Sequence, residues 1–218
     1  MSKNEEVETK NSKPFPCKII LVGDSGVGKT CIISRYMNEY KPNIGSTLST
    51  TYFTKLAVLD GYKINFQIWD TVGQEQYRSL NSLFFKDAHI CLMVYDITRK
   101  ESFKSIKDYW YNAVISNGLE GVIFGLAGNK NDLYENEDVD RNEVKEFASE
   151  INAIFKYTSA KQNVSIDELF EELGKNFVNS SFMRDVIEKE KLNDKENNFK
   201  LEKRRKSLKN EEKKKGCC

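Results

Sequence analysis

Short apolar runs alternate with segments of helical spacing along most of this 218-residue chain. Apolar runs at residues 17–22, 90–95, 122–127 and 153–157 predict strands, three of them buried on both sides. Apolar positions three or four residues apart predict helices at 29–38, 101–117, 138–152 and 165–179. Strands that alternate with helices favour a mostly parallel sheet with helices on both faces.

One pair of segments departs from this alternation. Residues 52–59 and 62–69 each alternate apolar and polar positions, and only Asp60 and Gly61 separate them. An Asp-Gly pair between two alternating segments is a strong signal for a two-residue hairpin turn. We therefore predict an α/β fold: a six-stranded, mostly parallel sheet with one antiparallel edge hairpin and helices on both faces.

The two ends of the chain differ from its body. Residues 1–15 are polar and charged, which predicts a disordered arm, and residues 181–218 are rich in Lys, Glu and Asn, which predicts a flexible tail. Residues 183–218 carry 13 Lys and Arg against 8 Asp and Glu, whereas the rest carries 21 against 25. An acidic body with a basic tail suits an anionic membrane surface better than nucleic acid. The body, residues 16–180, is the predicted folded domain.

Cysteine and apolar content narrow the class further. No apolar run reaches the roughly 18 residues that a membrane-spanning helix needs, and the N-terminus lacks a signal-peptide core. The five cysteines form no Cys-x-x-Cys pair, which disfavours a zinc site or a disulfide framework and favours a reducing cytosol. They are Cys17, Cys31, Cys91, Cys217 and Cys218.

The most informative motif is GDSGVGKT at residues 23–30, between the apolar run at 19–22 and a helical segment. A glycine-rich loop at that place presents backbone N–H groups that can hold phosphates. The Lys29 ammonium can neutralise β- and γ-phosphate oxygens, and the Thr30 hydroxyl can bind Mg²⁺. A plain glycine turn would need neither side chain. The expected phosphate contacts are Ser25, Gly26, Val27, Gly28, Lys29, Thr30 and Cys31.

A second motif, WDTVGQE at residues 69–75, ends the second hairpin strand. A carboxylate at Asp70 would leave the strand edge opposite the phosphate loop, where it can hold Mg²⁺ through water. Gly73 would let a backbone N–H approach the terminal phosphate. In isolation these residues could equally be a strand-ending Asp and a turn glycine, and the phosphate loop is what favours the functional interpretation.

Two further motifs predict which nucleobase the site binds. Residues 129–132, NKND, follow the strand at 122–127, and Asp132 can accept hydrogen bonds from N1–H and the 2-amino group of guanine. Adenine lacks both donors, so the same carboxylate would reject it. In the segment 158–161, TSAK, the Ala160 N–H could reach the guanine O6. Either motif alone could be an ordinary loop, whereas both in this order behind a phosphate loop are specific.

With these motifs in order, residues 16–180 resemble the Ras superfamily of small GTPases, and the Rab branch most closely. The Rab-like stretches are residues 66–69, 76–80, 84–88 and 93–98, and Gly216-Cys217-Cys218 resembles a Rab prenylation end. Residues 126–130, LAGNK, resemble the endosomal Rab branch.

The resemblance implies roles for individual residues. Thr47 would close on Mg²⁺ and the γ-phosphate, and Gln74 would orient the attacking water. Tyr40 would pack beside the guanine. The implied Mg²⁺ ligands are Thr30, Thr47 and Asp70, and the implied base contacts are Asn129, Lys130, Asp132, Ser159, Ala160 and Lys161.

The resemblance also implies a function: a monomeric switch between GTP and GDP forms, which hydrolyses GTP slowly unaided. A guanine nucleotide exchange factor, a GTPase-activating protein and a GDP-dissociation inhibitor or escort protein would regulate it, and no loop arginine is expected to act in cis. Effectors would contact Trp69 and Tyr77. Prenyl groups on Cys217 and Cys218 would hold it on the cytoplasmic face of an intracellular, endosomal membrane, with cycling through the cytosol. No nucleic-acid partner is expected.

Several positions depart from the family pattern. Val72 replaces the usual Ala, Leu48 and Ser49 replace Ile-Gly, and Tyr157 stands where Glu is common. The Thr30–Thr47 spacing is also one residue shorter. Val72 keeps one alternative open, a GTP-binding membrane scaffold with very slow hydrolysis. A separate alternative is a P-loop ATPase or nucleoside kinase, against which Asp132 argues. The aromatic set around Trp69 could serve packing alone, and the basic tail could be only solvated charge.

Overall fold

A computed structural model describes residues 9–11, 13–40, 51–71, 84–117 and 121–189 of the chain. The chain forms two compact units, Met1–Val178 and Asn179–Cys218, and each is described by itself. The first unit contains all the strands among the described residues.

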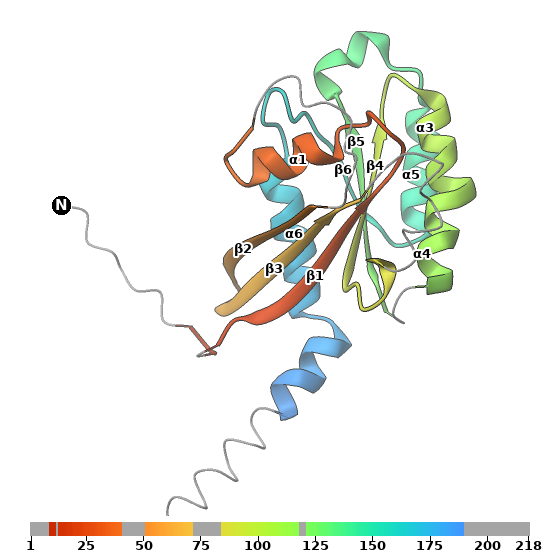
Figure 1. The fold of residues 1–218 in the computed structure, drawn as a ribbon. Coiled ribbons are helices and arrows are strands. Elements are labelled where there is room, and N and C mark those ends of the chain that lie inside the picture. The colour runs from red at the N-terminus through yellow and green to blue at the C-terminus, as the bar shows by residue number, and fades with distance from the viewer. Residues whose placement is uncertain (1–8, 12, 41–50, 72–83, 118–120, 190–218) are drawn as a thin grey trace, which may run out of the picture. The chain divides into compact units, whose positions relative to one another are not determined.

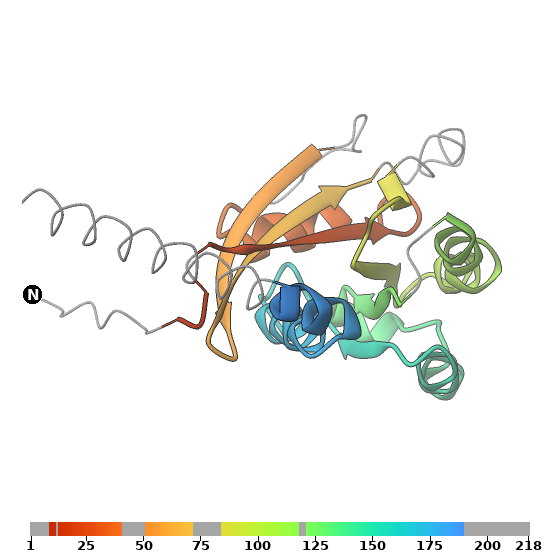
Figure 2. The same ribbon diagram turned by 90° about the horizontal axis from the view of Figure 1, so that it is seen from below.

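The first unit is built on a six-stranded sheet with the order β2-β3-β1-β4-β5-β6 (Figure 1). The β2–β3 pair is antiparallel and the other four pairs are parallel, so the predicted fold class is confirmed. The view from below shows the twist that such sheets carry (Figure 2). The strands are β1 (Phe15–Val22), β2 (Thr51–Leu59), β3 (Tyr62–Asp70), β4 (Ile90–Asp96), β5 (Ile123–Asn129) and β6 (Ile154–Tyr157).

The predicted edge hairpin is present. Leu59 pairs with Tyr62 in an antiparallel register, and only Asp60 and Gly61 lie between them. Both turn residues have positive φ, 49° at Asp60 and 82° at Gly61. A type I′ turn needs positive φ at both central positions, which explains why the Asp-Gly pair was informative.

Helices cover both faces of the sheet. α1 (Lys29–Tyr36) and α6 (Ile166–Val178) lie together on one side in Figure 1. Tyr36 stacks on Phe170 there, with ring centroids 3.9 Å apart. The other side carries α3 (Lys100–Ser105), α4 (Tyr111–Asn117) and α5 (Arg141–Glu150). There the buried Ile20 and Val22 of β1 belong to one apolar cluster with Trp110.

The predicted helix at 101–117 is interrupted in the middle. A π-helical stretch, η2 (Ile106–Trp110), separates α3 from α4. One extra residue per turn shifts the helix face from there on, a feature often found at functional sites. The fully buried Trp110, the last residue of η2, donates an indole hydrogen bond toward the phosphate loop.

Two residues of the N-terminal arm contact the hairpin, in the segment 1–15 for which the sequence predicts disorder. The Lys10 N–H donates to the Gly61 carbonyl at 2.7 Å. The Asn11 amide donates to the Lys63 carbonyl at 3.0 Å and accepts from the Lys63 N–H at 2.7 Å. These bonds attach residues 10 and 11 to the hairpin turn, which charge and polarity alone did not indicate. Residues 1–8 lie outside the described part.

In the second unit, the sequence predicts a flexible tail from residue 181, whereas residues 181–189 are helical. Ser180 begins this helix, because its hydroxyl accepts from the Met183 N–H at 3.2 Å. Among the described residues, no helix combines the length and the apolar character that crossing a membrane requires. The rest of the tail, with Cys217 and Cys218, lies outside the described residues.

Candidate functional site

The predicted site residues gather at one edge of the sheet. β1, β3, β4, β5 and β6 run parallel, so their carboxyl ends meet at the same edge (Figure 1). The segments that follow them are the phosphate loop at 23–28, Asp70, residues 97–99, residues 130–132 and residues 158–161. The crevice outside the carboxyl ends of the strands is where open α/β sheets bind their ligands.

The phosphate loop can be formed only with glycines at two positions. Gly23 has φ 140°, and a Cβ there would lie 2.1 Å from the backbone oxygen of Val94. Gly28 has φ 99°, and a Cβ there would lie 2.3 Å from the side-chain nitrogen of Asn129. The loop is therefore pressed against β4 and the start of the NKND segment, and any side chain would force them apart.

Lys29 is buried under this loop. Its ammonium donates to the backbone oxygens of Gly23 at 2.8 Å and Asp24 at 3.0 Å. Burial lowers the pKa of Lys29 to about 8, although the carboxylates of Asp70 and Asp24 oppose that shift. A buried cation that uses neutral carbonyls as acceptors is well placed to gain from a nearby phosphate anion.

A second layer behind the loop was not predicted. The Trp110 indole donates to the Asp24 carboxylate at 3.0 Å, and the Arg99 guanidinium donates to the Ser25 carbonyl at 3.0 Å. Arg99 also lies 3.4 Å from the Asp96 carboxylate. The sequence signal for Trp110 was only its helical spacing, which is equally typical of a core position. For Asp24 and Arg99, no sequence pattern indicated that their side chains support the phosphate loop.

The expected metal ligands Thr30 and Asp70 are in contact. The Thr30 hydroxyl donates to the buried Asp70 carboxylate at 2.5 Å. The neighbouring Thr71 hydroxyl donates to the Leu21 carbonyl at 2.6 Å, which holds the end of β3 against β1. A hydroxyl and a carboxylate are oxygen ligands suited to Mg²⁺, which takes few protein ligands beside phosphate oxygens. Among the described residues, no three His, Cys, Asp or Glu side chains cluster as a larger metal site would require.

Asn129 connects the phosphate loop to the TSAK segment. Its side-chain nitrogen donates to the Val27 carbonyl at 2.8 Å. Its side-chain oxygen accepts from the Thr158 hydroxyl at 3.3 Å and from the Ala160 N–H at 3.4 Å. One buried amide therefore joins three separate segments, so this residue is a structural bridge at the predicted site.

Asp132 and Ser159 meet as the order of the motifs suggested. The Ser159 hydroxyl donates to the Asp132 carboxylate at 2.6 Å and accepts from the Gln162 N–H at 3.1 Å. The Lys161 ammonium lies 3.8 Å from the same carboxylate, whose side chain is only 8% exposed. The carboxylate is thereby oriented by groups from the TSAK segment.

Lys130 is held by an acidic residue that sequence reasoning missed. Its ammonium lies 2.6 Å from the Asp96 carboxylate, at the end of β4. Burial would raise the pKa of Asp96, but hydrogen bonds from Lys130 and Thr98 outweigh it and hold that pKa below its ordinary value. Asp96 therefore stays ionised and fixes Lys130, whose backbone is left-handed with φ 65°.

Tyr40 was expected beside the guanine. Its ring lies 3.8 Å from the Arg35 guanidinium carbon. Arg35 in turn bonds to the TSAK segment, which places Tyr40 at the base end of the site. The remaining predicted site residues lie outside the described part: Thr47, Gly73, Gln74, Tyr77, Cys217 and Cys218.

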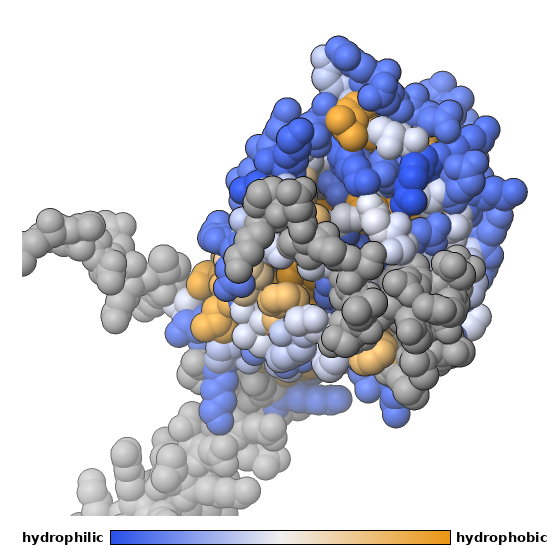
Figure 3. Space-filling view, turned by 45° about the horizontal axis from the view of Figure 1, so that its top comes forward, coloured by the Kyte–Doolittle hydropathy of each residue, from blue (hydrophilic) through white to orange (hydrophobic). Residues whose placement is uncertain are grey.

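The outer face of the hairpin carries aromatic and apolar side chains. Trp69 lies 5.0 Å from Tyr52 and 5.7 Å from Phe84, measured between ring centroids. Tyr52 is 46% exposed and Leu56 is 67% exposed. Figure 3 shows apolar side chains gathered on one part of this face, among polar surroundings. Core packing alone does not account for apolar side chains that remain in contact with solvent.

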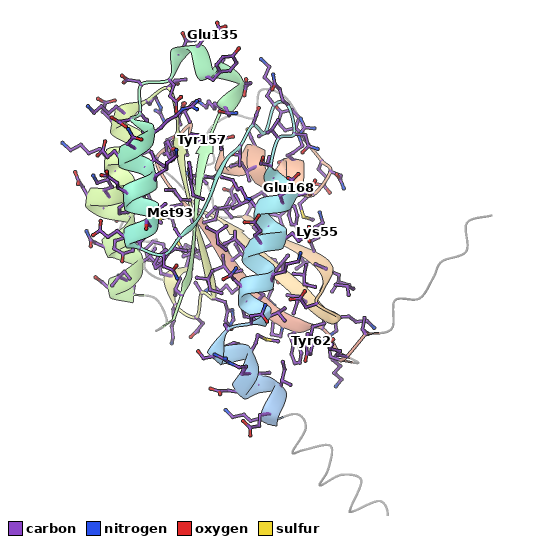
Figure 4. All side chains as sticks on the ribbon, turned by 180° about the vertical axis from the view of Figure 1, so that it is seen from behind. Lys55, Tyr62, Met93, Glu135, Tyr157 and Glu168 are labelled. Carbon is purple, nitrogen blue, oxygen red and sulfur yellow. The ribbon has the colours of Figure 1, made fainter. Side chains whose placement is uncertain are left out.

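Tyr157, one of the departures from the family pattern, lies on the α5 side of the sheet (Figure 4). It packs against the buried cluster there, and the Arg141 guanidinium lies 5.0 Å from its ring centre. A Cβ on Gly128 would approach the Tyr157 ring to 2.9 Å. The large side chain at 157 is thus accommodated by a glycine in the neighbouring strand.

Comparison with known proteins gives a consistent result. Residues 18–179 match the model of the Ras family. The chain is 36% identical over 159 residues to the Ras-related protein Rab-22A of Homo sapiens, covering 72% of this chain and 81% of that protein. It is 39% identical over 166 residues to Rab-17 of Mus musculus, covering 76% and 77%. It is 40% identical over 172 residues to the putative ras-related protein Rab-5B of Dictyostelium discoideum, covering 78% and 79%.

Proposed function

The chain belongs to the Ras family as a Rab-type small GTPase, a GTP-hydrolysing switch of vesicle trafficking, and on this premise we propose which of its residues perform each step. In this proposal residues 16–180 form the GTP-binding domain. Residues 1–15 precede it as an arm, and residues 181–218 follow as the membrane-directed tail.

The phosphate end holds the nucleotide through the loop backbone and Lys29. The N–H groups of residues 25–31 point their partial positive charges at the phosphates, together with the start of α1. Lys29 shifts from the Gly23 and Asp24 carbonyls toward the β- and γ-phosphate oxygens. Thr30, Asp70 and Thr47 would hold Mg²⁺, which when bound neutralises phosphate charge. The contact between Thr30 and Asp70 at 2.5 Å supports this assignment.

The base end selects guanine. Asp132 accepts from N1–H and the 2-amino group, and the Ala160 N–H, which lies 3.4 Å from the Asn129 side-chain oxygen in the structure, would donate to O6 in the complex. Lys130 and Tyr40 enclose the base, and Asn129 ties this end to the phosphate loop. The single observation that carries the proposal is the convergence of Asp132 and Ser159, from segments 27 residues apart, at 2.6 Å.

Hydrolysis is assigned to Gln74, which would orient the attacking water. Thr47 and Gly73 would be ordered by the γ-phosphate and released after hydrolysis, an order–disorder switch. Unaided turnover in this superfamily is on the order of 10⁻⁴ s⁻¹, and an activating protein that supplies an arginine raises it by roughly 10³–10⁵.

Single-turnover hydrolysis of GTP tests the enzyme assignment. The wild type and Gln74→Leu are compared with and without a Rab GTPase-activating protein. We expect the wild type to respond to the activating protein and Gln74→Leu to respond far less. Equal rates under both conditions would instead support the GTP-binding scaffold. Preference for ATP over GTP would overturn the assignment of the base end.

Rab proteins associate with intracellular membranes, endosomes included, and we propose that Cys217 and Cys218 anchor this chain by prenylation. The basic tail beside them would add attraction to anionic lipids, and two chains give stable anchoring that an escort protein can reverse. Cycling through the cytosol follows from that reversibility. Imaging a tagged Cys217→Ser/Cys218→Ser protein beside the wild type tests this, and membrane residence of the double variant would contradict it.

Exchange factors, activating proteins and GDP-dissociation inhibitors regulate Rab proteins, and effectors bind them. For this chain we propose that effectors contact the surface around Trp69 and Tyr77, because the half-buried Trp69 packs beside the exposed Tyr52 there. The chain would act as a monomer and bind no nucleic acid. Loss of effector binding in Trp69→Ala with normal GTP binding would support the assignment.

A further inference from the structure

We propose that Arg35 is a positioning residue for the guanine base, and that it also sets the rate of nucleotide release through Tyr40. The inference deepens the proposed function and rests on it. Its starting point is that Arg35, on α1, contacts the TSAK segment and an aromatic side chain at the same time.

The first observation is a pair of hydrogen bonds. Arg35 Nε donates to the Ala160 carbonyl at 2.7 Å, and Arg35 Nη2 donates to the Lys161 carbonyl at 3.0 Å. The planar guanidinium presents both donors in a fixed geometry, so the two consecutive carbonyls are held together. The bonds join residues 125 and 126 positions apart in the chain, which makes them tertiary contacts.

These two bonds orient the segment that is expected to read the base. The C=O and N–H of one trans peptide unit point in opposite directions, so a fixed Ala160 carbonyl fixes the Lys161 N–H. On its other side, the Ala160 N–H points to the Asn129 side-chain oxygen at 3.4 Å. Ala160 is therefore held from α1 and from the NKND segment, and Arg35 supplies the α1 side.

The second observation is how the chain leaves α1. Asn38 has φ 61°, its N–H donates to the Arg35 carbonyl at 3.0 Å, and the Glu39 N–H donates to the Ser34 carbonyl at 2.7 Å. This pair of bonds is the Schellman motif, with Asn38 at the left-handed position. It turns the chain back, so that Tyr40 lies over the Arg35 guanidinium at 3.8 Å.

The two sets of contacts use different parts of Arg35. The edges of the guanidinium donate to the TSAK carbonyls, while its face stacks on Tyr40, so both can be made at once. Because α1 starts with Lys29 and Thr30, a rigid helix links the phosphate contacts to Arg35. Through α1, Arg35 thus connects the base end with the predicted phosphate contacts Lys29 and Thr30.

The test uses Arg35→Lys, which keeps the charge and removes the paired donors. Release of fluorescently labelled GDP is measured, together with affinities for GDP and for 2-aminopurine riboside diphosphate, which lacks O6 and the N1–H but keeps the 2-amino group. We expect release to become roughly ten- to a hundredfold faster. The preference for GDP over the analogue should fall at least about fivefold, because the O6 contact depends on the oriented segment.

Arg141→Lys is the matched control. Arg141 also combines an ion pair, to Glu137 at 2.7 Å, with an aromatic ring, that of Tyr157, but it lies on α5. The Arg141→Lys substitution should leave the rate of GDP release and the preference for GDP over the analogue unchanged. Faster release by Arg35→Lys without any change in base preference would show a merely structural role and overturn the proposal. Unchanged release would overturn it as well.

Tyr40→Leu keeps the proposal testable if Arg35→Lys folds poorly. It removes the stacked ring and leaves both hydrogen bonds, so we expect a smaller acceleration of release. If both single variants fold, GDP release is also measured in the double variant. An acceleration smaller than the product of the two single accelerations would support coupling through Arg35. Independent effects would overturn that coupling. A wild type without preference for GDP over ADP would instead refute the proposed function itself.

Discussion

The phosphate end and the base end of this site are built by different means. At the phosphate end the proposed ligand-binding groups are backbone N–H groups and one buried ammonium, and glycines permit the close packing of the loop. At the base end the key contacts join side chains, as between Asp132 and Ser159 or Asn129 and Thr158. The phosphate end therefore depends on backbone shape, and the base end on hydrogen-bonding partners.

This difference determines which amino-acid substitutions each end of the site can accept. A side chain added at Gly23 would meet the backbone oxygen of Val94, which cannot move without displacing β4. A side chain exchanged at the base end changes donors and acceptors while the backbone stays in place. We therefore expect substitutions at the phosphate end to affect folding and binding together, and substitutions at the base end to change which base is bound.

The largest effect is expected for Gly23→Ala. Its Cβ would lie 2.1 Å from the Val94 oxygen at φ 140°, so the cost should be about 3 kcal/mol or more of unfolding free energy. Urea unfolding without added nucleotide measures it. Gly26→Ala is the control, because its φ is 76° but no atom lies within 4 Å of its Cβ, and it should cost about 1–2 kcal/mol. Equal losses of unfolding free energy in Gly23→Ala and Gly26→Ala would refute the role of close packing at Gly23.

Asp132→Asn should change the base preference and leave the fold intact. The substitution removes two charge-assisted contacts to guanine, worth together about 3 kcal/mol or roughly a hundredfold in GDP affinity. Xanthine presents an acceptor in place of the 2-amino group, so affinity for xanthosine diphosphate should rise. Titration calorimetry with both nucleotides measures the change, and Asp138→Asn, at an exposed position, serves as control. Equal losses of affinity for GDP and for xanthosine diphosphate would contradict base-specific recognition.

The pH dependence of binding should come from the phosphate end. The Lys29 pKa of about 8 applies to the nucleotide-free protein, and phosphate binding favours the charged form. Affinity for GDP should be flat below about pH 8 and should fall above it by up to tenfold per pH unit. Between pH 8 and the ordinary lysine pKa of 10.5, the unfolded chain holds more protons, so the nucleotide-free protein should become more stable as pH rises.

Calorimetry at pH 7 and pH 8.5, in two buffers of different ionisation enthalpy, measures the expected proton uptake. Lys29→Arg is the control, because a guanidinium does not lose its proton in this range. If this variant takes up as many protons as the wild type at pH 8.5, Lys29 is not the titrating group.

The smallest effect is expected for Ser159→Ala. It removes one donor to Asp132, which should weaken GDP binding by about 1 kcal/mol, or roughly fivefold. The stability of the nucleotide-free protein should change little. Ser149→Ala, on the exposed surface of α5, is the matched control. A loss as large as that of Asp132→Asn would mean that the carboxylate cannot act without its serine partner.

Local patterns were enough to predict the strands, the hairpin and the motif segments. The Asp-Gly turn and the apolar runs depend on neighbouring residues, and the four parallel pairs follow from the alternation of strand and helix. The π-helical stretch at 106–110 was not predictable, because the apolar spacing of 101–117 fits a regular helix. The attachment of Asn11 was missed for a related reason: a polar side chain in a charged arm has no local sign of a partner 52 residues away.

By itself, the sequence determined that this chain holds a guanine nucleotide, because GDSGVGKT, NKND and TSAK each carry their chemistry within a few residues. Only the tertiary structure decided which groups support them. Trp110, Arg99, Asp96 and Arg35 reach the site from segments that are distant in the chain. The physical reason is that a hydrogen bond depends on the direction and distance of two groups in space, and composition and spacing record neither.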